Sequence, residues 1–156
     1  MPSATPPPPQ SRAAAAACAF CCVRTLLAKR NAVVYRDARV FGMEDHNPRA
    51  ATHLLVVPHE HIPHVDALAP EHAELLGHMI ATGKELLAQR GVVDPSQFQL
   101  GFHRPPFASV QHLHLHCLGF PFVPSWNRLR FTPSFLGSYV DAERVLAALQ
   151  RDASGS

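Results

Sequence analysis

Three short segments of the chain have the hydrophobic patterns expected of strands. Residues 31–45 (NAVVYRDARVFGMED) predict two strands joined by a turn at Arg36–Asp37. Residues 52–58 (THLLVVP) are mostly apolar and predict a strand that ends at Pro58. In residues 97–103 (QFQLGFH), large apolar side chains alternate with glutamine and glycine, which predicts a strand with one buried face.

The spacing changes from two residues to three and four between Pro70 and Gln89, which predicts an amphipathic helix. Its apolar face comprises Leu75, Leu76, Met79, Ile80, Leu86 and Leu87. Pro70 suits the first turn of a helix, and Gly91 follows as a stop. A second helix is expected after Asp141 as N-cap, with Val145, Leu146 and Leu149 on its buried side.

Strands grouped in hairpins around one long helix indicate an α+β fold. We expect a mainly antiparallel sheet of about five strands, one long helix and a C-terminal helix. The 156 residues are enough for one hydrophobic core, and we place a single domain at residues 16–150. Residues 1–15, which are rich in proline and alanine, and residues 151–156 are expected to be disordered tails.

Composition argues against two classes of partner. The formal net charge is only +2, and the twelve arginines and two lysines are scattered, so no basic stripe for nucleic acid is evident. No apolar run approaches the roughly 20 residues of a membrane helix. We expect a cytoplasmic or nuclear protein. The first acidic residue is Asp37, a composition that also occurs in transit peptides, so organelle import stays open.

Eleven histidines are the unusual feature of the composition, and three alternate with leucine in residues 112–116 (HLHLH). In a strand this spacing places His112, His114 and His116 on one face. A His-x-His pair could hold a catalytic zinc ion. Alternatively, one imidazole could act as nucleophile or general base while its neighbours orient it and donate protons. A solvated histidine face is the third interpretation.

The run HLHLHCL resembles the signature of the histidine triad superfamily, in which histidines alternate with apolar residues. The segments CAFC and MEDHNPRAATHLLVVPHEHI agree with that resemblance, as does a serine three residues before the triad. Within the superfamily, QLGFHRPPFASVQHLHLH and the segment NRLRFTPSFLGSYVDAERVL are similar to the third Hint subgroup, and more distantly to the aprataxin branch.

The resemblance implies the histidine triad fold, commonly present as a homodimer. It implies hydrolysis or transfer at the α-phosphate of an adenosine 5′-monophosphate derivative, in the first instance a phosphoramidate (AMP-NH-R). No cofactor is required for this chemistry. Neutral imidazole is a competent nucleophile near pH 7, and an adjacent protonated histidine can protonate a departing amine.

The resemblance also assigns roles to individual residues. His114 would be the nucleophile, His116 would contact the phosphate oxygens, and His53 with His112 would complete a proton relay. The implied substrate-binding residues are Asp45, His46, His103, Phe107, Ser109 and His116. Asp45 would bind the ribose hydroxyls, but it could instead stabilise a turn. Ser109 would lie beside the phosphate, but it could instead cap the loop.

Some members of the superfamily hold a structural zinc ion, and the matching residues here are Cys18, Cys21, His61 and His112. Two thiolates and two imidazoles make an ordinary tetrahedral zinc site. If zinc binds there, His112 is a ligand and cannot also transfer a proton.

Three alternative functions stay open. One is a zinc-dependent hydrolase that uses the His-x-His pair as its catalytic ligands. Another is a nucleotide-binding adaptor with vestigial turnover. Removal of AMP from DNA ends ranks lowest, because no cysteine or histidine follows Cys117 to build the additional zinc finger of the aprataxin branch.

Overall fold

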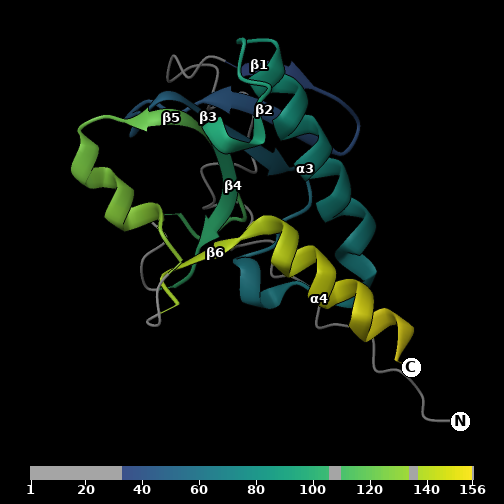
Figure 1. Ribbon diagram of the computed structural model, residues 1–156. Helices are drawn as coiled ribbons and strands as arrows, with labels where there is room; N and C mark the ends of the chain where they lie inside the picture. The colour runs from purple at the N-terminus through teal and green to yellow at the C-terminus, as the bar shows by residue number, and fades with distance from the viewer. Residues whose placement is uncertain (1–32, 106–109, 134–136, 156) are drawn as a thin grey trace, which may run out of the picture.

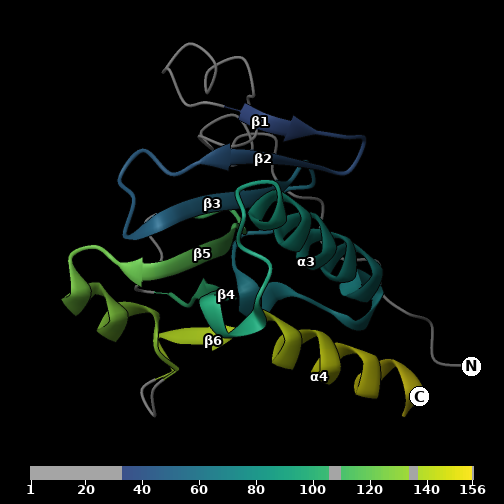
Figure 2. The same ribbon diagram turned by 45° about the horizontal axis from the view of Figure 1, so that its top comes forward.

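The computed structural model describes residues 33–105, 110–133 and 137–155. Its strands form one sheet in which all neighbours are antiparallel, in the order β1-β2-β3-β5-β4-β6 (Figure 2). The strands are β1 Val33–Arg36, β2 Val40–Glu44, β3 Ala50–Pro58, β4 Phe98–His103, β5 Leu115–Phe122 and β6 Tyr139–Asp141. The α+β class, the antiparallel sheet and the four N-terminal strands predicted from the sequence are confirmed.

The sheet has six strands where about five were expected. The additional strand, β6, pairs with the end of β4, where Gly101 opposes Asp141 and His103 opposes Tyr139. Three residues are too few to show a period of two in the sequence. The segment after β5 also contains a 3-10 helix, η4 Ser125–Phe131.

The long helix is α3 Ala73–Ala88, and a short 3-10 turn, η2 Pro70–His72, precedes it. Helix α4 spans Ala142–Ser154, and the carboxylate of Asp141 accepts a hydrogen bond from the backbone N–H of Arg144, as its N-cap role predicts. This helix continues past Gln150, so the C-terminal boundary predicted from the sequence is too early. The predicted tail at residues 1–15 lies outside the described residues.

The two faces of the sheet have different environments. Helices α3 and α4 lie together on one side, while η4 lies apart from them in both views (Figures 1 and 2). The main core lies between the sheet and these helices, and its sheet residues include Leu54, Val56, Leu100 and Leu115. Because side chains alternate along a strand, His53 and His116 point to the opposite face. Within the described residues, neither helix is long and apolar enough to cross a membrane.

The predicted histidine strand is only partly correct. β5 begins at Leu115, so His116 belongs to the strand while His112 and His114 lie in the segment that leads into it. In that segment the backbone N–H of Leu113 donates a hydrogen bond to the carbonyl of Ile62 rather than joining a ladder. The alternation in the sequence therefore does not place all three imidazoles in one environment.

Candidate functional site

Strand register brings histidines from three strands together. In the β3–β5 pair, His116 opposes Leu55 and His53 opposes Leu118, so both histidines lie on the same face. Their rings lie 5.2 Å apart, and His103 on β4 places its ring 5.0 Å from that of His116. The ring of His114 also lies 5.0 Å from that of His116. His116 is therefore the centre of a cluster of four histidines.

Hydrogen bonds fix the tautomer of His53 and then that of His116. The backbone N–H of Arg49 donates to Nδ1 of His53 at 3.0 Å, so the proton of a neutral His53 ring is on Nε2. That N–H points at Nδ1 of His116, 2.9 Å away, which must accept it. A neutral His116 therefore carries its proton on Nε2, an atom that is buried and has no hydrogen-bond partner within the described residues.

His114 is held in the opposite tautomer. Its Nδ1 lies 2.7 Å from the carbonyl oxygen of His112, so Nδ1–H donates to that oxygen. The lone pair of a neutral His114 ring is then on Nε2. This arrangement is the one that nucleophilic attack requires, because the attacking nitrogen must be unprotonated.

His112 is bound to a different part of the structure. Its Nε2–H donates to the carbonyl of Pro58 at 2.8 Å, and its Nδ1 lies 3.0 Å from Nδ1 of His61. Two imidazole nitrogens that converge in this way could both bind one metal ion, and the bond to Pro58 is the outer-shell contact expected of a metal-binding histidine. Cys18 and Cys21, the other predicted ligands, lie outside the described residues.

A second group of possible metal ligands comprises Asp45, His53 and His116, whose donor atoms all lie within 4.8 Å of one another. A metal ion on Nε2 of His53 would require the ring proton to be on Nδ1, where Arg49 already donates. This conflict makes the group poorly suited to metal binding. Within the described residues, no such group of three contains two histidines of the HLHLH run, as the zinc hydrolase hypothesis would need.

Burial keeps the histidines of the cluster neutral. It lowers the pKa of His53 from 6.5 to about 4, although the carboxylate of Asp45 opposes the change. Burial also lowers the pKa of His114, again opposed by Asp45 and by the bond to the His112 carbonyl. For His116, burial and then the nearby His114 and His53 hold the pKa well below its ordinary value. Neutral rings at pH 7 favour a nucleophilic role.

Asp45 shows features of both interpretations proposed from the sequence. One carboxylate oxygen, Oδ1, accepts a hydrogen bond from the backbone N–H of Asn47 at 2.9 Å, which stabilises the turn. The other oxygen lies 3.4 Å from Nε2 of His53 and would stabilise a positive charge on that ring. The adjacent His46 is largely exposed, with 80% of its side-chain surface accessible.

Phe131, at the end of η4, belongs to the site but was not predicted from the sequence. Its ring lies 4.7 Å from His103, 5.4 Å from His116 and 5.8 Å from His53. His103 was expected to contact substrate, but its Nε2–H donates to the backbone carbonyl of Arg130 at 2.8 Å. No periodic pattern marks the 3-10 segment in the sequence, so only the structure reveals these contacts. Phe107 and Ser109 lie outside the described residues.

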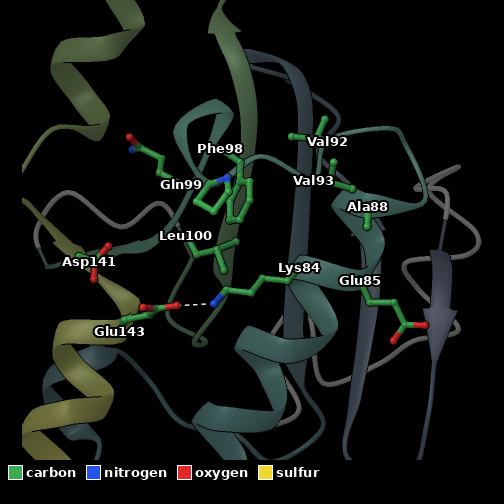
Figure 3. Close-up of a pocket in the computed structure, with 11 residues that line it drawn as sticks. Lys84, Glu85, Ala88, Val92, Val93, Phe98, Gln99, Leu100, Asp141 and Glu143 are labelled. Carbon is green, nitrogen blue, oxygen red and sulfur yellow. Dashed lines mark hydrogen bonds and ion pairs between the residues drawn. The ribbon is translucent and has the colours of Figure 1, made fainter.

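The cavity drawn in Figure 3 is separate from the histidines. It has a volume of about 670 Å³ and lies between α3, the first half of β4 and the start of α4. Lys84 and Glu143 form an ion pair across it. The residues that line it supply no imidazole or thiol, so the chemistry expected of the chain belongs to the histidine cluster on the other face.

Comparison with known proteins agrees with this assignment. The model of the family described as "Scavenger mRNA decapping enzyme C-term binding" matches residues 17–131. A solved HIT family hydrolase from Legionella pneumophila Philadelphia 1 shares 29% sequence identity, with a TM-score of 0.59. The similarity covers 67% of this chain and 93% of that one.

Two relatives have activities on adenosine compounds. A bifunctional adenosine 5′-phosphosulfate phosphorylase/adenylylsulfatase of Arabidopsis thaliana is 38% identical over 121 residues, which are 76% of this chain and 82% of the relative. An adenosine 5′-monophosphoramidase of Xenopus tropicalis is 34% identical over 99 residues, 64% of this chain and 65% of its own length. The aprataxin of Danio rerio is 34% identical over 76% of this chain, which spans only 37% of that protein.

Proposed function

The chain belongs to the histidine triad superfamily, and on that premise we propose that it hydrolyses adenosine 5′-monophosphoramidates or related adenylated small molecules. The reaction would pass through a covalent AMP intermediate on His114. One observation carries this proposal: the hydrogen bond from Nδ1 of His114 to the His112 carbonyl leaves Nε2 unprotonated for attack. Relatives that act on adenosine phosphoramidates and on adenosine 5′-phosphosulfate support the substrate class.

In the first step, the Nε2 lone pair of His114 attacks the α-phosphorus, and the bond from phosphorus to the leaving amine breaks. The amine needs a proton to depart. The negative phosphate would favour one additional proton on the His53–His116 pair. That proton would be bound at Nδ1 of His53 in place of the Arg49 hydrogen bond, and the Asp45 carboxylate would stabilise the positive charge. His53 would then pass its Nε2 proton to Nδ1 of His116. His116 then donates the proton on its Nε2, the buried atom with no partner among the described residues, to the leaving amine.

In the second step, water attacks the phosphorus of the nucleotidyl-histidine and the N–P bond breaks. His116 accepts the proton of the water on Nε2, which restores the protonated pair, while Nε2 of His114 regains its lone pair. AMP leaves as the product. The two steps conserve protons, and the relay within the described residues involves only His53 and His116.

We propose that His112 has a structural rather than a proton-transferring role. Its Nδ1 and that of His61 could hold a zinc ion with the thiolates of Cys18 and Cys21, and the ion would attach the N-terminal segment to the domain. Metal analysis of the purified protein tests this site. About one zinc per chain, lost in a Cys18→Ser/Cys21→Ser variant that still turns over substrate, is the expected result; a metal-free wild-type protein would refute it.

Adenosine 5′-phosphosulfate is a second candidate substrate. The Arabidopsis relative that acts on it is covered over 82% of its length. Sulfate is a much weaker base than an amine, so it departs without a proton. Its departure therefore requires no protonated histidine in the cluster. Parallel kcat/KM measurements with this compound and with an adenosine phosphoramidate would rank the two substrates.

Mass spectrometry after mixing with an adenylated amine tests the covalent intermediate. We expect an AMP adduct on His114 in the wild type and no adduct in His114→Asn. A His114→Asn protein as fast as wild type would disprove the proposal. Tight AMP binding with no adduct and no turnover would indicate a nucleotide-binding adaptor instead.

We also propose that the chain forms a homodimer through the part of β4 that does not pair with β6, residues Phe98–Leu100. Strand β6 pairs only with Gly101–His103, which leaves the outer edge at Phe98–Leu100 beside the cavity of Figure 3. Val93, 69% exposed, lies at this cavity. Light scattering after size-exclusion chromatography should show a dimer that Val93→Glu weakens. The exposed Val34 on β1 provides the matched control, Val34→Glu.

A further inference from the structure

Two side chains of β4 donate hydrogen bonds to consecutive backbone carbonyls at the end of η4. Nε2 of Gln99 lies 2.5 Å from the carbonyl oxygen of Phe131, and Nε2 of His103 lies 2.8 Å from that of Arg130. Positions 99 and 103 are an even number of residues apart, so both side chains lie on the face of the sheet that carries the catalytic histidines. The end of η4 is thus bound directly to the strand beside the site.

Apart from Phe131, which packs in a core cluster with Leu118 and Tyr139, the large apolar side chains of η4 contribute little to its attachment. Trp126 is 57% exposed and Leu129 is 75% exposed, so neither contributes much to burial. Only Asn127 and Phe131 are buried in this helix. A seven-residue 3-10 helix also has weak internal hydrogen bonding. The two hydrogen bonds from β4 therefore matter for the position of η4.

The position of η4 determines the position of the Phe131 ring. This ring is 2% exposed and contacts His53, His103 and His116, so it covers the proton relay from the η4 side. On that side the ring excludes water and keeps the hydrogen bonds of the relay in a low-dielectric environment. If Phe131 moves away, water reaches His116 and the relay geometry loosens.

We infer that Gln99 and His103 are positioning residues, which hold η4 so that Phe131 covers the histidine relay. This inference rests on the proposed function for its effect on rate, but not for its structural part. It also reassigns His103: the Nε2 donor that a phosphate contact would use is engaged by η4 instead.

Four variants test the inference. Gln99→Glu preserves side-chain shape, but a carboxylate cannot donate to the Phe131 carbonyl. His103→Leu removes the other donor, and His103→Gln restores an amide donor at the same position. Leu129→Gln changes an exposed residue of the same helix and serves as the control. The measurements are nuclear Overhauser contacts between the Phe131 ring and the rings of His53 and His116, together with kcat and KM.

We expect Gln99→Glu and His103→Leu to lose these ring contacts and about tenfold or more in kcat, with KM changed by less than about threefold. His103→Gln and Leu129→Gln should keep both. Unchanged ring contacts and kcat in Gln99→Glu and His103→Leu would overturn the inference. So would a rise in KM for His103→Leu with the contacts intact, because that result assigns His103 to substrate.

The ring contacts separate this inference from the proposed function. A wild-type protein that turns over no adenylated compound refutes the proposed function. Loss of the ring contacts in Gln99→Glu would still support the inference that Gln99 positions η4. If Gln99→Glu does not fold, Gln99→Ala removes the same donor without adding a charge, and the same outcomes apply to it.

Discussion

Nε2 of His53 lies 2.9 Å from Nδ1 of His116, although the two histidines are 63 residues apart in the chain. The bond exists because β3 and β5 pair in a register that places both residues on one face. Arg49 fixes its direction by donating to the other nitrogen of His53. Under the proposed mechanism the pair would form a short proton pathway that ends at the buried Nε2 of His116.

Removal of the His53 side chain should slow the reaction strongly. In His53→Leu, His116 loses its proton partner, and the contribution of general acid–base catalysis is typically 10²–10⁴-fold. We expect kcat to fall by about 10²-fold or more with an adenosine phosphoramidate. His53→Gln, whose amide could still donate to His116, should lose less. Equal kcat in wild type and His53→Leu would show that the relay is not used.

Asp45→Asn distinguishes the two roles of this residue. The amide oxygen of asparagine can still accept the hydrogen bond from the backbone N–H of Asn47, so the turn should persist. The charge beside His53 is lost, which disfavours the protonated relay. We expect kcat to fall by about tenfold. An increase in KM alone would instead indicate that Asp45 binds the ribose.

The stability of the fold should decrease in mild acid because of buried histidines. The pKa of His53 falls from 6.5 to about 4 on folding, so between these pH values the unfolded chain binds the proton and the folded chain does not. The free energy of unfolding should therefore decrease as pH falls through this window, by at most roughly 3 kcal/mol from His53. Above pH 6.5 this residue should have no effect.

Urea unfolding of wild type and His53→Gln at pH 7.5 and pH 4.5 measures this contribution. The loss of stability between the two pH values should be smaller in the variant, because glutamine does not titrate. Some loss of stability at pH 4.5 should persist in the variant, because burial also lowers the pKa of His116. An identical loss in the two proteins would contradict the prediction.

Two glycines provide a matched test of packing. At Gly101, a Cβ atom would lie 2.2 Å from the Tyr139 hydroxyl and 2.5 Å from the Val140 carbonyl, so Gly101→Ala should destabilise the fold by about 1–3 kcal/mol. At Gly77 in α3, a Cβ would meet nothing within 4 Å. Gly77→Ala should therefore stabilise by about 1 kcal/mol, because alanine is the better helix former. Urea denaturation measures both, and opposite signs are the expected result.

The sequence by itself determined most of the secondary structure and the family. The segments with strand-like hydrophobic patterns became β1 to β4. The spacing of Leu76, Met79 and Leu87 defined α3, because it reflects burial of a single helix face. The HLHLH run, with His53 directly before the residues LLVVP, was specific enough to identify the superfamily. Asp141 was correctly predicted as a helix cap because its local chemistry is independent of tertiary contacts.

Only the tertiary structure decided that the three histidines of the HLHLH run have different partners. Alternation fixes a face only where the residues lie in a strand, and His112 and His114 precede β5. Long-range partners then direct each ring: His112 toward Pro58 and His61, His116 toward His53. The same holds for η4 and Phe131, whose place depends on hydrogen bonds from β4 that no local pattern encodes. Periodicity in the sequence reflects which face of a helix or strand is buried. The assembly of a site depends instead on strand register and on contacts between residues distant in the chain.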